Sequence, residues 1–297
     1  MTRTGLNTLI DGMADGTLVP YLGPGALFDV VDGATGEAMP ADSDSLILAM
    51  NNGRPMAPKL MYEFPRAAMN QELKRGRTSV TRFLADLYGR PGWRGGAVHG
   101  WLASVVPPYV IDVNRDLLLQ SLYADRPHLL IRGLARLGGT DYRFRIHRWD
   151  GDAYHEMVPT AAVPDLPVLF KPLGSPVPDP TFVASDADFV DYITELMGGF
   201  AIPGFVKTRR KGRRYVFLGL RLTRDTERMV LSDLIHDAGQ PAGHAVIAEP
   251  TEKEVRYCAR MNIEIVRADM AEVAAALKGH AAPGDVHPGA APEAAGT

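Results

Sequence analysis

The sequence contains one cysteine, Cys258, so no disulfide can form within the chain and no four-cysteine zinc module can be built. We expect this thiol to be buried, because it lies in an amphipathic helical stretch. No apolar run approaches the roughly 18 residues that a membrane-spanning helix needs, and the N-terminus lacks a secretory apolar segment. These absences favour a cytoplasmic protein without a membrane partner.

An excess of charge of either sign is also missing. The 32 Lys and Arg residues face 35 Asp and Glu residues, for a formal net charge of -3. Such a chain has no general attraction to nucleic acid, so that partner would need a local basic patch. One basic run exists at residues 207–214 (KTRRKGRR), and we predict that it is a solvated loop before a strand. The alternative is that it contacts a protein partner.

Several catalytic motifs are absent as well. The chain has no G-x-S-x-G elbow and no G-x-x-x-x-G-K-[ST] loop, which argues against a serine hydrolase and a P-loop nucleotidase. Its eight histidines include no pair at the helical spacing of a zinc protease. We therefore predict no metal site.

What the sequence does contain is an alternation of short apolar strands and amphipathic helices. Expected strands are 18–22, 109–112, 142–146, 168–171, 214–218, 245–248 and 263–266. Expected helices are 4–15, 117–123, 128–137, 186–197, 224–237, 252–260 and 269–277. Strands separated by helices imply right-handed crossovers. The predicted fold class is therefore α/β, a Rossmann-like parallel sheet with helices on both faces.

We predict a single domain over residues 1–278. Within it, about 43–106 is expected to form several helices without a strand, as a helical insertion after the first strand. A tight turn at 150–151 predicts a hairpin that extends toward His155. The tail 279–297 is rich in Ala, Pro and Gly and is predicted to be disordered.

Candidate binding loops follow the predicted strands, because parallel sheets bind ligands beyond the carboxyl ends of their strands. These turns begin at Gly23, Asn114, Gly174 and Gly219. Gly23 and Gly25 lack side chains that would keep a diphosphate from the backbone, although Pro24 offers no N–H donor. The alternative is a tight turn without a ligand. Asn114 could orient a water or a ribose hydroxyl, and the alternative for it and for Asp116 is a helix cap.

Four segments, taken in order, resemble motifs of the sirtuin-like family, in particular its bacterial branch without zinc. They are 18–26 (LVPYLGPGA), similar to L-V-P-F-L-G-A-G-V; 111–118 (IDVNRDLL), similar to T-T-N-Y-D-D-L-L; 170–175 (FKPLGS), similar to K-L-H-G-S; and 216–223 (VFLGLRLT), similar to F-L-G-Y-S-L-T. The resemblance extends over roughly residues 5–278.

The resemblance implies that NAD or ADP-ribose binds, and that active members cleave NAD at the nicotinamide–ribose bond. It places Asn114 and Asp116 at catalytic positions. It assigns NAD binding to Gly23, Pro24, Gly25, Ala26, Asn114, Gly174, Ser175, Gly219, Arg221 and Thr223. Leu173 stands where the family has its catalytic histidine, and leucine cannot accept a proton.

The sequence thus predicts a sirtuin-like NAD-binding protein of the NAD glycohydrolase type, related to bacterial defence proteins, with an impaired catalytic site. An NAD-dependent protein deacylase is one alternative, disfavoured by the missing zinc module. A non-catalytic module that senses NAD or ADP-ribose, or that binds a protein partner or a second copy, is another. If the protein is an enzyme, His147 or His155 could replace the missing base from the hairpin.

Overall fold

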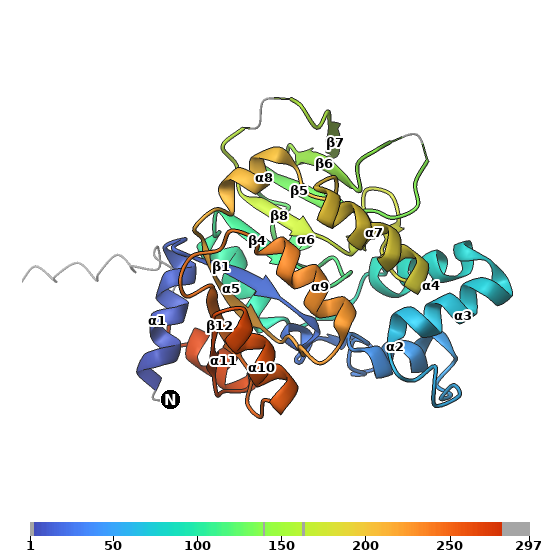
Figure 1. Cartoon of the computed structure of the whole chain (residues 1–297), viewed down its shortest axis with the longest axis horizontal. Helices are drawn as coiled ribbons and strands as arrows, with labels where there is room; N and C mark the ends of the chain where they lie inside the picture. Colours follow the sequence, from blue (N-terminus) through green and yellow to red (C-terminus); the bar gives the residue numbers. More distant parts are fainter. Residues whose placement is uncertain (1–2, 139, 162–163, 281–297) are drawn as a thin grey trace, which may run out of the picture.

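The computed structural model describes residues 3–138, 140–161 and 164–280, and Figure 1 shows their course. A nine-stranded sheet with the order β13-β12-β11-β1-β4-β8-β5-β6-β7 forms its centre. The strands from β13 to β5 pair in parallel, whereas β6 and β7 extend the edge in antiparallel pairing. These strands are β1 (Leu18–Leu22), β4 (Tyr109–Asp112), β5 (His128–Gly133), β6 (Phe144–Trp149), β7 (Tyr154–Met157), β8 (Val168–Lys171), β11 (Arg214–Leu218), β12 (Gly243–Val246) and β13 (Ile263–Val266).

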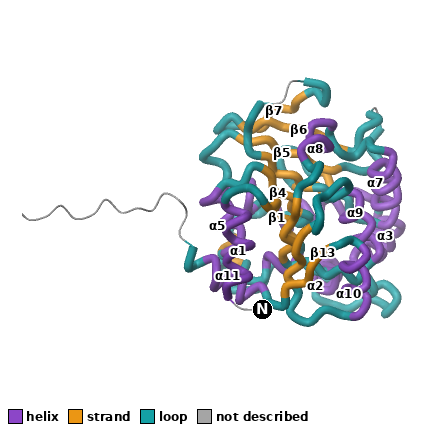
Figure 2. The backbone as a smooth tube through the Cα atoms, turned by 60° about the vertical axis from the view of Figure 1, so that its left-hand side comes forward, coloured by secondary structure: helices purple, strands orange, loops and turns teal. Residues whose placement is uncertain are grey.

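Helices cover both faces of the sheet, as Figure 2 shows. One face carries α1 (Arg3–Ala14), α5 (Ala97–Val105), α6 (Leu118–Leu122) and α11 (Met270–Leu277). The other carries α7 (Asp186–Gly198), α8 (Gly204–Arg209), α9 (Asp225–Leu234) and α10 (Glu252–Arg260). The remaining elements are α2 (Ser43–Met50), α3 (Phe64–Arg75), α4 (Arg77–Gly89), the 3-10 helix η1 (Pro24–Leu27), and the two-stranded pairs β2 (Val31–Asp32) with β3 (Trp93–Arg94) and β9 (Gly174–Ser175) with β10 (Thr181–Phe182).

The central strand β1 shows why the sequence forms this sandwich of layers. All five of its residues are buried. Val19 and Tyr21 enter the core beneath α7 to α10, whereas Leu18 and Leu22 enter the core beneath α1, α5 and α11. Because successive strand residues point to opposite faces, a continuously apolar strand needs cover on both sides. The predicted α/β class with a Rossmann-like sheet is confirmed.

The chain between β1 and β4 forms the helical insertion. Helices α2, α3 and α4 pack around a core of their own, which includes Ile47, Phe64 and Leu84. The insertion is smaller than predicted, because α5 packs on the sheet with α1 and α11. The prediction of no strand between 43 and 106 is also wrong, since β3 pairs with β2.

The segment predicted as a helix over 128–137 is instead the strand β5. All six residues of β5 are buried, and they pair with β8 on one side and with β6 on the other. A short apolar run of this kind can be either a buried helix or a buried strand, and only long-range pairing decides between them. The predicted hairpin beyond it is confirmed, because β6 and β7 pair in antiparallel fashion.

The basic run 207–214 is only in part the solvated loop that the sequence predicted, since residues 211–213 form an exposed turn before β11. Its first residues end α8, and the Lys207 Nζ donates a hydrogen bond to the Gly199 carbonyl oxygen. Arg210 is buried, and its guanidinium donates to the Asp233 carbonyl oxygen. Two of the charges are thus used inside the fold, where they satisfy carbonyl groups at helix ends.

Cys258 is buried, as predicted, and burial raises the pKa of its thiol to about 11. Such a thiol is protonated and inert at neutral pH. Among the described residues, no helix has the length and apolar content to cross a bilayer. Most of the tail that was predicted to be disordered, from residue 281 onward, lies outside the described residues.

Candidate functional site

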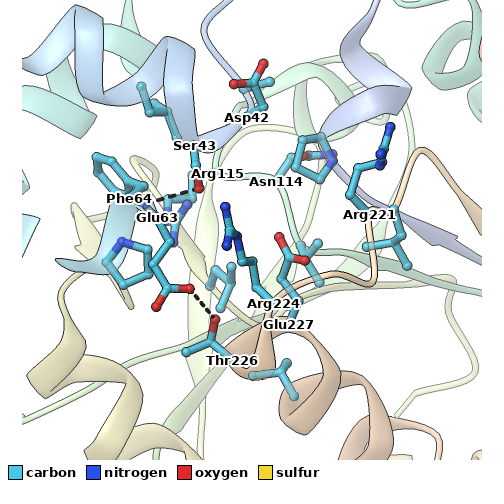
Figure 3. A pocket seen from close by; sticks show the side chains of 18 of the residues that line it. Asp42, Ser43, Glu63, Phe64, Asn114, Arg115, Arg221, Arg224, Thr226 and Glu227 are labelled. Carbon is cyan, nitrogen blue, oxygen red and sulfur yellow. Dashed lines mark hydrogen bonds between the residues drawn. The ribbon is translucent and has the colours of Figure 1, made fainter. Parts of the chain in front are cut away.

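A cavity of about 330 Å³ opens where β1, β4, β8 and β11 end. The loops that follow these strands contribute Pro24, Asn114, Leu173 and Arg221 to its wall. Helices α2, α3 and α9 supply much of the rest, and Figure 3 shows side chains from these loops and helices around the cavity. Because the four strands are parallel, their carboxyl ends meet at one edge of the sheet, which is where α/β proteins bind ligands.

The glycines predicted to wrap a diphosphate are used first to bring two loops together. Gly25 donates its backbone N–H to the Gly219 carbonyl oxygen at 2.8 Å. Gly219 has φ +70°, and a Cβ there would lie 2.2 Å from the Ala26 backbone nitrogen. Of the predicted loop residues, Pro24 lines the cavity, whereas Gly23, Gly25 and Ala26 do not. The glycines therefore allow the loops after β1 and β11 to touch, and this contact positions Pro24.

Asn114 joins the loop after β4 to the loop after β1. Its Nδ2 donates to the Gly23 carbonyl oxygen at 3.0 Å, and its backbone N–H donates to the Asp112 Oδ1 at 3.0 Å. The residue is 4% exposed and lines the cavity. Among the described residues no hydrogen bond to its Oδ1 is found, so this oxygen can accept one from a ligand.

A buried charge cluster lies behind Asn114. The Lys171 Nζ donates to the Asp112 Oδ2 at 2.6 Å, and both side chains are 1% exposed. Burial raises the pKa of Asp112, although the positive charge of Lys171 opposes the shift. Since the Asp112 Oδ1 also accepts a hydrogen bond from the Asn114 backbone N–H, the cluster fixes the orientation of the loop after β4.

Asp116, predicted as catalytic, lies in this cluster and does not line the cavity. Its Oδ1 accepts from the Leu118 backbone N–H at 2.8 Å, so it caps the turn before α6. Ligand atoms of His99, Asp112 and Asp116 all lie within 4.8 Å of one another, a spacing that would suit a metal ion. Lys171 already supplies a positive charge to Asp112, which disfavours a second cation there.

Gly174 and Ser175 also lie outside the cavity wall. A Cβ at Gly174 would lie 2.0 Å from the Thr181 carbonyl oxygen, so glycine is required where β9 meets β10. The Ser175 hydroxyl donates to the Val177 carbonyl oxygen at 2.8 Å. These two residues support the turn that carries Leu173 into the cavity wall, and they do not reach the cavity themselves.

Arg221 and Thr223, to which the resemblance assigns NAD binding, both line the cavity. The Arg221 side chain is 68% exposed, and its Nε lies 3.6 Å from the Glu254 Oε1. At that distance and exposure the ion pair is weak, so the guanidinium is free to turn toward a ligand.

Neither histidine considered as a substitute base lines the cavity. His147 lies in β6, and burial together with the charge of Arg132 lowers its pKa to about 4. His155 lies in β7 and is paired with Asp150 at 2.7 Å. Both belong to the antiparallel edge of the sheet, whereas the cavity opens at strands nearer its centre.

Sequence patterns do not single out the polar residues that the insertion and α9 contribute to the cavity wall. Ser43 accepts from the Phe64 backbone N–H at 3.1 Å, which joins α2 to α3. The Thr226 hydroxyl lies 3.4 Å from the Glu63 Oε2, which joins α3 to α9 (Figure 3). Glu227 adds a second glutamate to the wall. A glutamate in the first turn of an expected helix was the available signal, but it is equally typical of an ordinary helix start.

Comparison with known families gives one match. A family model described as SIR2-like domain matches residues 108–266, which is more than half of the chain. The matched part begins just before β4 and ends with β13, so it contains three of the four motif segments and lacks the loop after β1. A search of curated proteins found no match.

Proposed function

This chain belongs to the SIR2-like family, and from that premise we propose that its cavity binds NAD. Members of the family generally use NAD as a substrate or cofactor. The observation that carries the proposal is Asn114, which is buried at the meeting point of two strand ends and keeps its Oδ1 available within the cavity wall. An amide oxygen in that place can accept a hydrogen bond from a ribose hydroxyl or from a water.

The charges of the cavity wall support the same ligand. Arg221 and Arg224 are donors that suit a diphosphate. Asp42, Glu63 and Glu227 are carboxylates that suit the cationic nicotinamide ring. NAD carries both groups, so a wall with both signs of charge fits it better than it fits a simple phosphate ester.

The activity that we propose is slow cleavage of NAD at the nicotinamide–ribose bond, of the NAD glycohydrolase type. Leu173 lines the cavity just after β8, and the resemblance to the family places a catalytic histidine at this position. A general base contributes about 10²- to 10⁴-fold to a rate, so a site without this histidine should bind NAD and cleave it slowly unless another side chain takes the proton.

Calorimetry with NAD and with ADP-ribose tests the binding proposal. We expect saturable binding at one site, and a loss of affinity of about tenfold or more in Asn114→Ala, which removes the free oxygen. His155→Ala, on the exposed β7, is the matched control and should bind as the unmodified chain does. Absence of saturable binding by either nucleotide would refute the proposal.

Leu173 also favours a second candidate, a non-catalytic module that senses NAD or ADP-ribose. Chromatography of nicotinamide separates the two, because a sensor binds NAD without releasing nicotinamide. An NAD-dependent protein deacylase is the remaining alternative, and removal of the acyl group from an acetyl-lysine peptide only when NAD is present would replace our proposal with it.

A further inference from the structure

The cavity wall contains no histidine among the described residues, but it contains two glutamates from distant parts of the chain. Glu63 precedes α3 in the insertion, and Glu227 lies in the first turn of α9. Packing of α3 and α9 around the same cavity places both residues in its wall, and Figure 3 shows the Arg224 side chain between them.

The two carboxylates differ in their hydrogen bonding. The Glu63 Oε2 accepts from the Thr226 hydroxyl at 3.4 Å. The Glu227 Oε2 is enclosed and has no hydrogen-bond partner among the described residues. An enclosed carboxylate oxygen without a partner is costly to keep, so its presence in a cavity wall indicates a group that the cavity is meant to receive.

The surroundings of Glu227 also suit proton transfer. Burial raises its pKa to about 7, a backbone hydrogen bond from Arg224 opposes this shift, and the charge of Glu63 adds to it. The guanidinium of Arg224 lowers the pKa and Glu254 raises it, so charges of both signs face this carboxyl. A carboxyl that titrates near neutral pH can accept a proton during a reaction and return it to solvent afterwards.

We propose that Glu227 is the proton acceptor that stands in for the missing histidine, an inference that rests on the proposed cleavage of NAD. In this step the bond between the ribose C1′ and the nicotinamide nitrogen breaks, and its electron pair stays with nicotinamide. A water oxygen bonds to C1′, and the water proton passes to the Glu227 carboxylate. The products are nicotinamide and ADP-ribose, and the proton then leaves to solvent.

The test measures nicotinamide release at saturating NAD between pH 5.5 and 8.5 for the full chain, for Glu227→Gln and for a control. Because a base acts when deprotonated, kcat of the unmodified chain should rise with pH and level off above about pH 7. Glu227→Gln should lower kcat by about 100-fold, lose the rise, and keep KM within about threefold. The control, Glu252→Gln in the exposed first turn of α10, should follow the unmodified chain.

The possible results distinguish a failure of the role of Glu227 from a failure of the proposed NAD binding. A Glu227→Gln variant that keeps the unmodified kcat or its pH dependence overturns the role of Glu227. Binding of ADP-ribose without any nicotinamide release also overturns that role, but leaves NAD binding intact. Neither binding nor release means that the proposed function fails as well.

A second variant covers the case in which Glu227→Gln does not fold, as judged by its ADP-ribose affinity. Glu227→Asp keeps the carboxylate and withdraws it by one methylene. We then expect a lower kcat with the pH dependence retained, whereas an unchanged kcat overturns the inference.

Discussion

Among single residues, Leu173 is the one at which our proposal separates binding of NAD from its rapid cleavage. It lines the cavity just after β8. We predict that Leu173→His raises the rate of nicotinamide release by at least about tenfold, because it adds a general base. Leu173→Gln is the control, since it is polar but cannot accept a proton. Equal rates in the two variants would contradict the prediction.

Gly219 lies where the loops after β1 and β11 touch, and no side chain fits there. Its φ of +70° and the 2.2 Å between an added Cβ and the Ala26 nitrogen make any side chain unfavourable there. We predict that Gly219→Ala lowers the free energy of unfolding by about 3 kcal/mol in urea denaturation. Gly212 has a similar φ of +68°, but a Cβ added there would meet no atom within 4 Å. Gly212→Ala should therefore lower the free energy of unfolding by only about 1 kcal/mol. Equal losses would mean that the loop contact is not tight.

The raised pKa of Glu227 also makes stability depend on pH. Its folded-state pKa of about 7 lies above the ordinary value of 4.5, so the native state binds this proton more tightly than the unfolded chain does. The associated stability is present below pH 4.5 and is lost as pH rises through 7. We predict that Glu227→Gln raises the free energy of unfolding by about 2 kcal/mol at pH 8 and by less at pH 5. The same gain at both pH values would count against the burial of a charged carboxylate.

At the scale of elements, one buried carboxylate joins the insertion to the sheet layer. Asp188 in α7 forms a capping box with Ser185, and its Oδ1 lies 3.0 Å from Arg77 of α4 and 2.8 Å from Arg136 after β5. Three segments that are far apart in sequence therefore depend on one side chain. Its loss would take a buried carboxylate away from two partly buried arginines, of which Arg136 would keep its pair with Glu72.

We predict that Asp188→Ala lowers the free energy of unfolding by about 3 kcal/mol, measured by urea denaturation. Asp125→Ala provides the comparison, because Asp125 is 67% exposed in its pair with Arg126, and we expect this variant to lose far less stability. Similar losses in the two variants would show that α7 does not hold the insertion in place.

The strands also show which parts of the fold a sequence pattern can predict. Strands such as β1, β8 and β13 could be predicted because each is a short apolar run that ends at a turn or a helix start. The strand β5 could not, because the pairing with β6 and β8 that makes it a strand is not encoded locally. The same limit explains why Asn114 was found and Glu227 was not. Asn114 follows a strand end, whereas Glu227 reaches the cavity only through the packing of α9.

For the molecule as a whole, the arrangement of the sheet and its covering helices determines where the cavity lies. The parallel strands bring their loops to one edge, and the insertion between β1 and β4 adds α2 and α3 to the wall on that side. Membership of the SIR2-like family rests on residues 108–266, so the insertion and the loop after β1 lie outside the matched part. A defence role, cytoplasmic location and assembly with a partner or a second copy stay predictions.

We propose that this cavity holds NAD through Asn114 and the loop after β1, and a crystal structure of the protein with ADP-ribose is the decisive test. We expect the diphosphate to lie beside Pro24 and Arg221 and a ribose hydroxyl to donate to the Asn114 Oδ1. ADP-ribose bound elsewhere on the molecule, with the cavity filled by solvent, would contradict it.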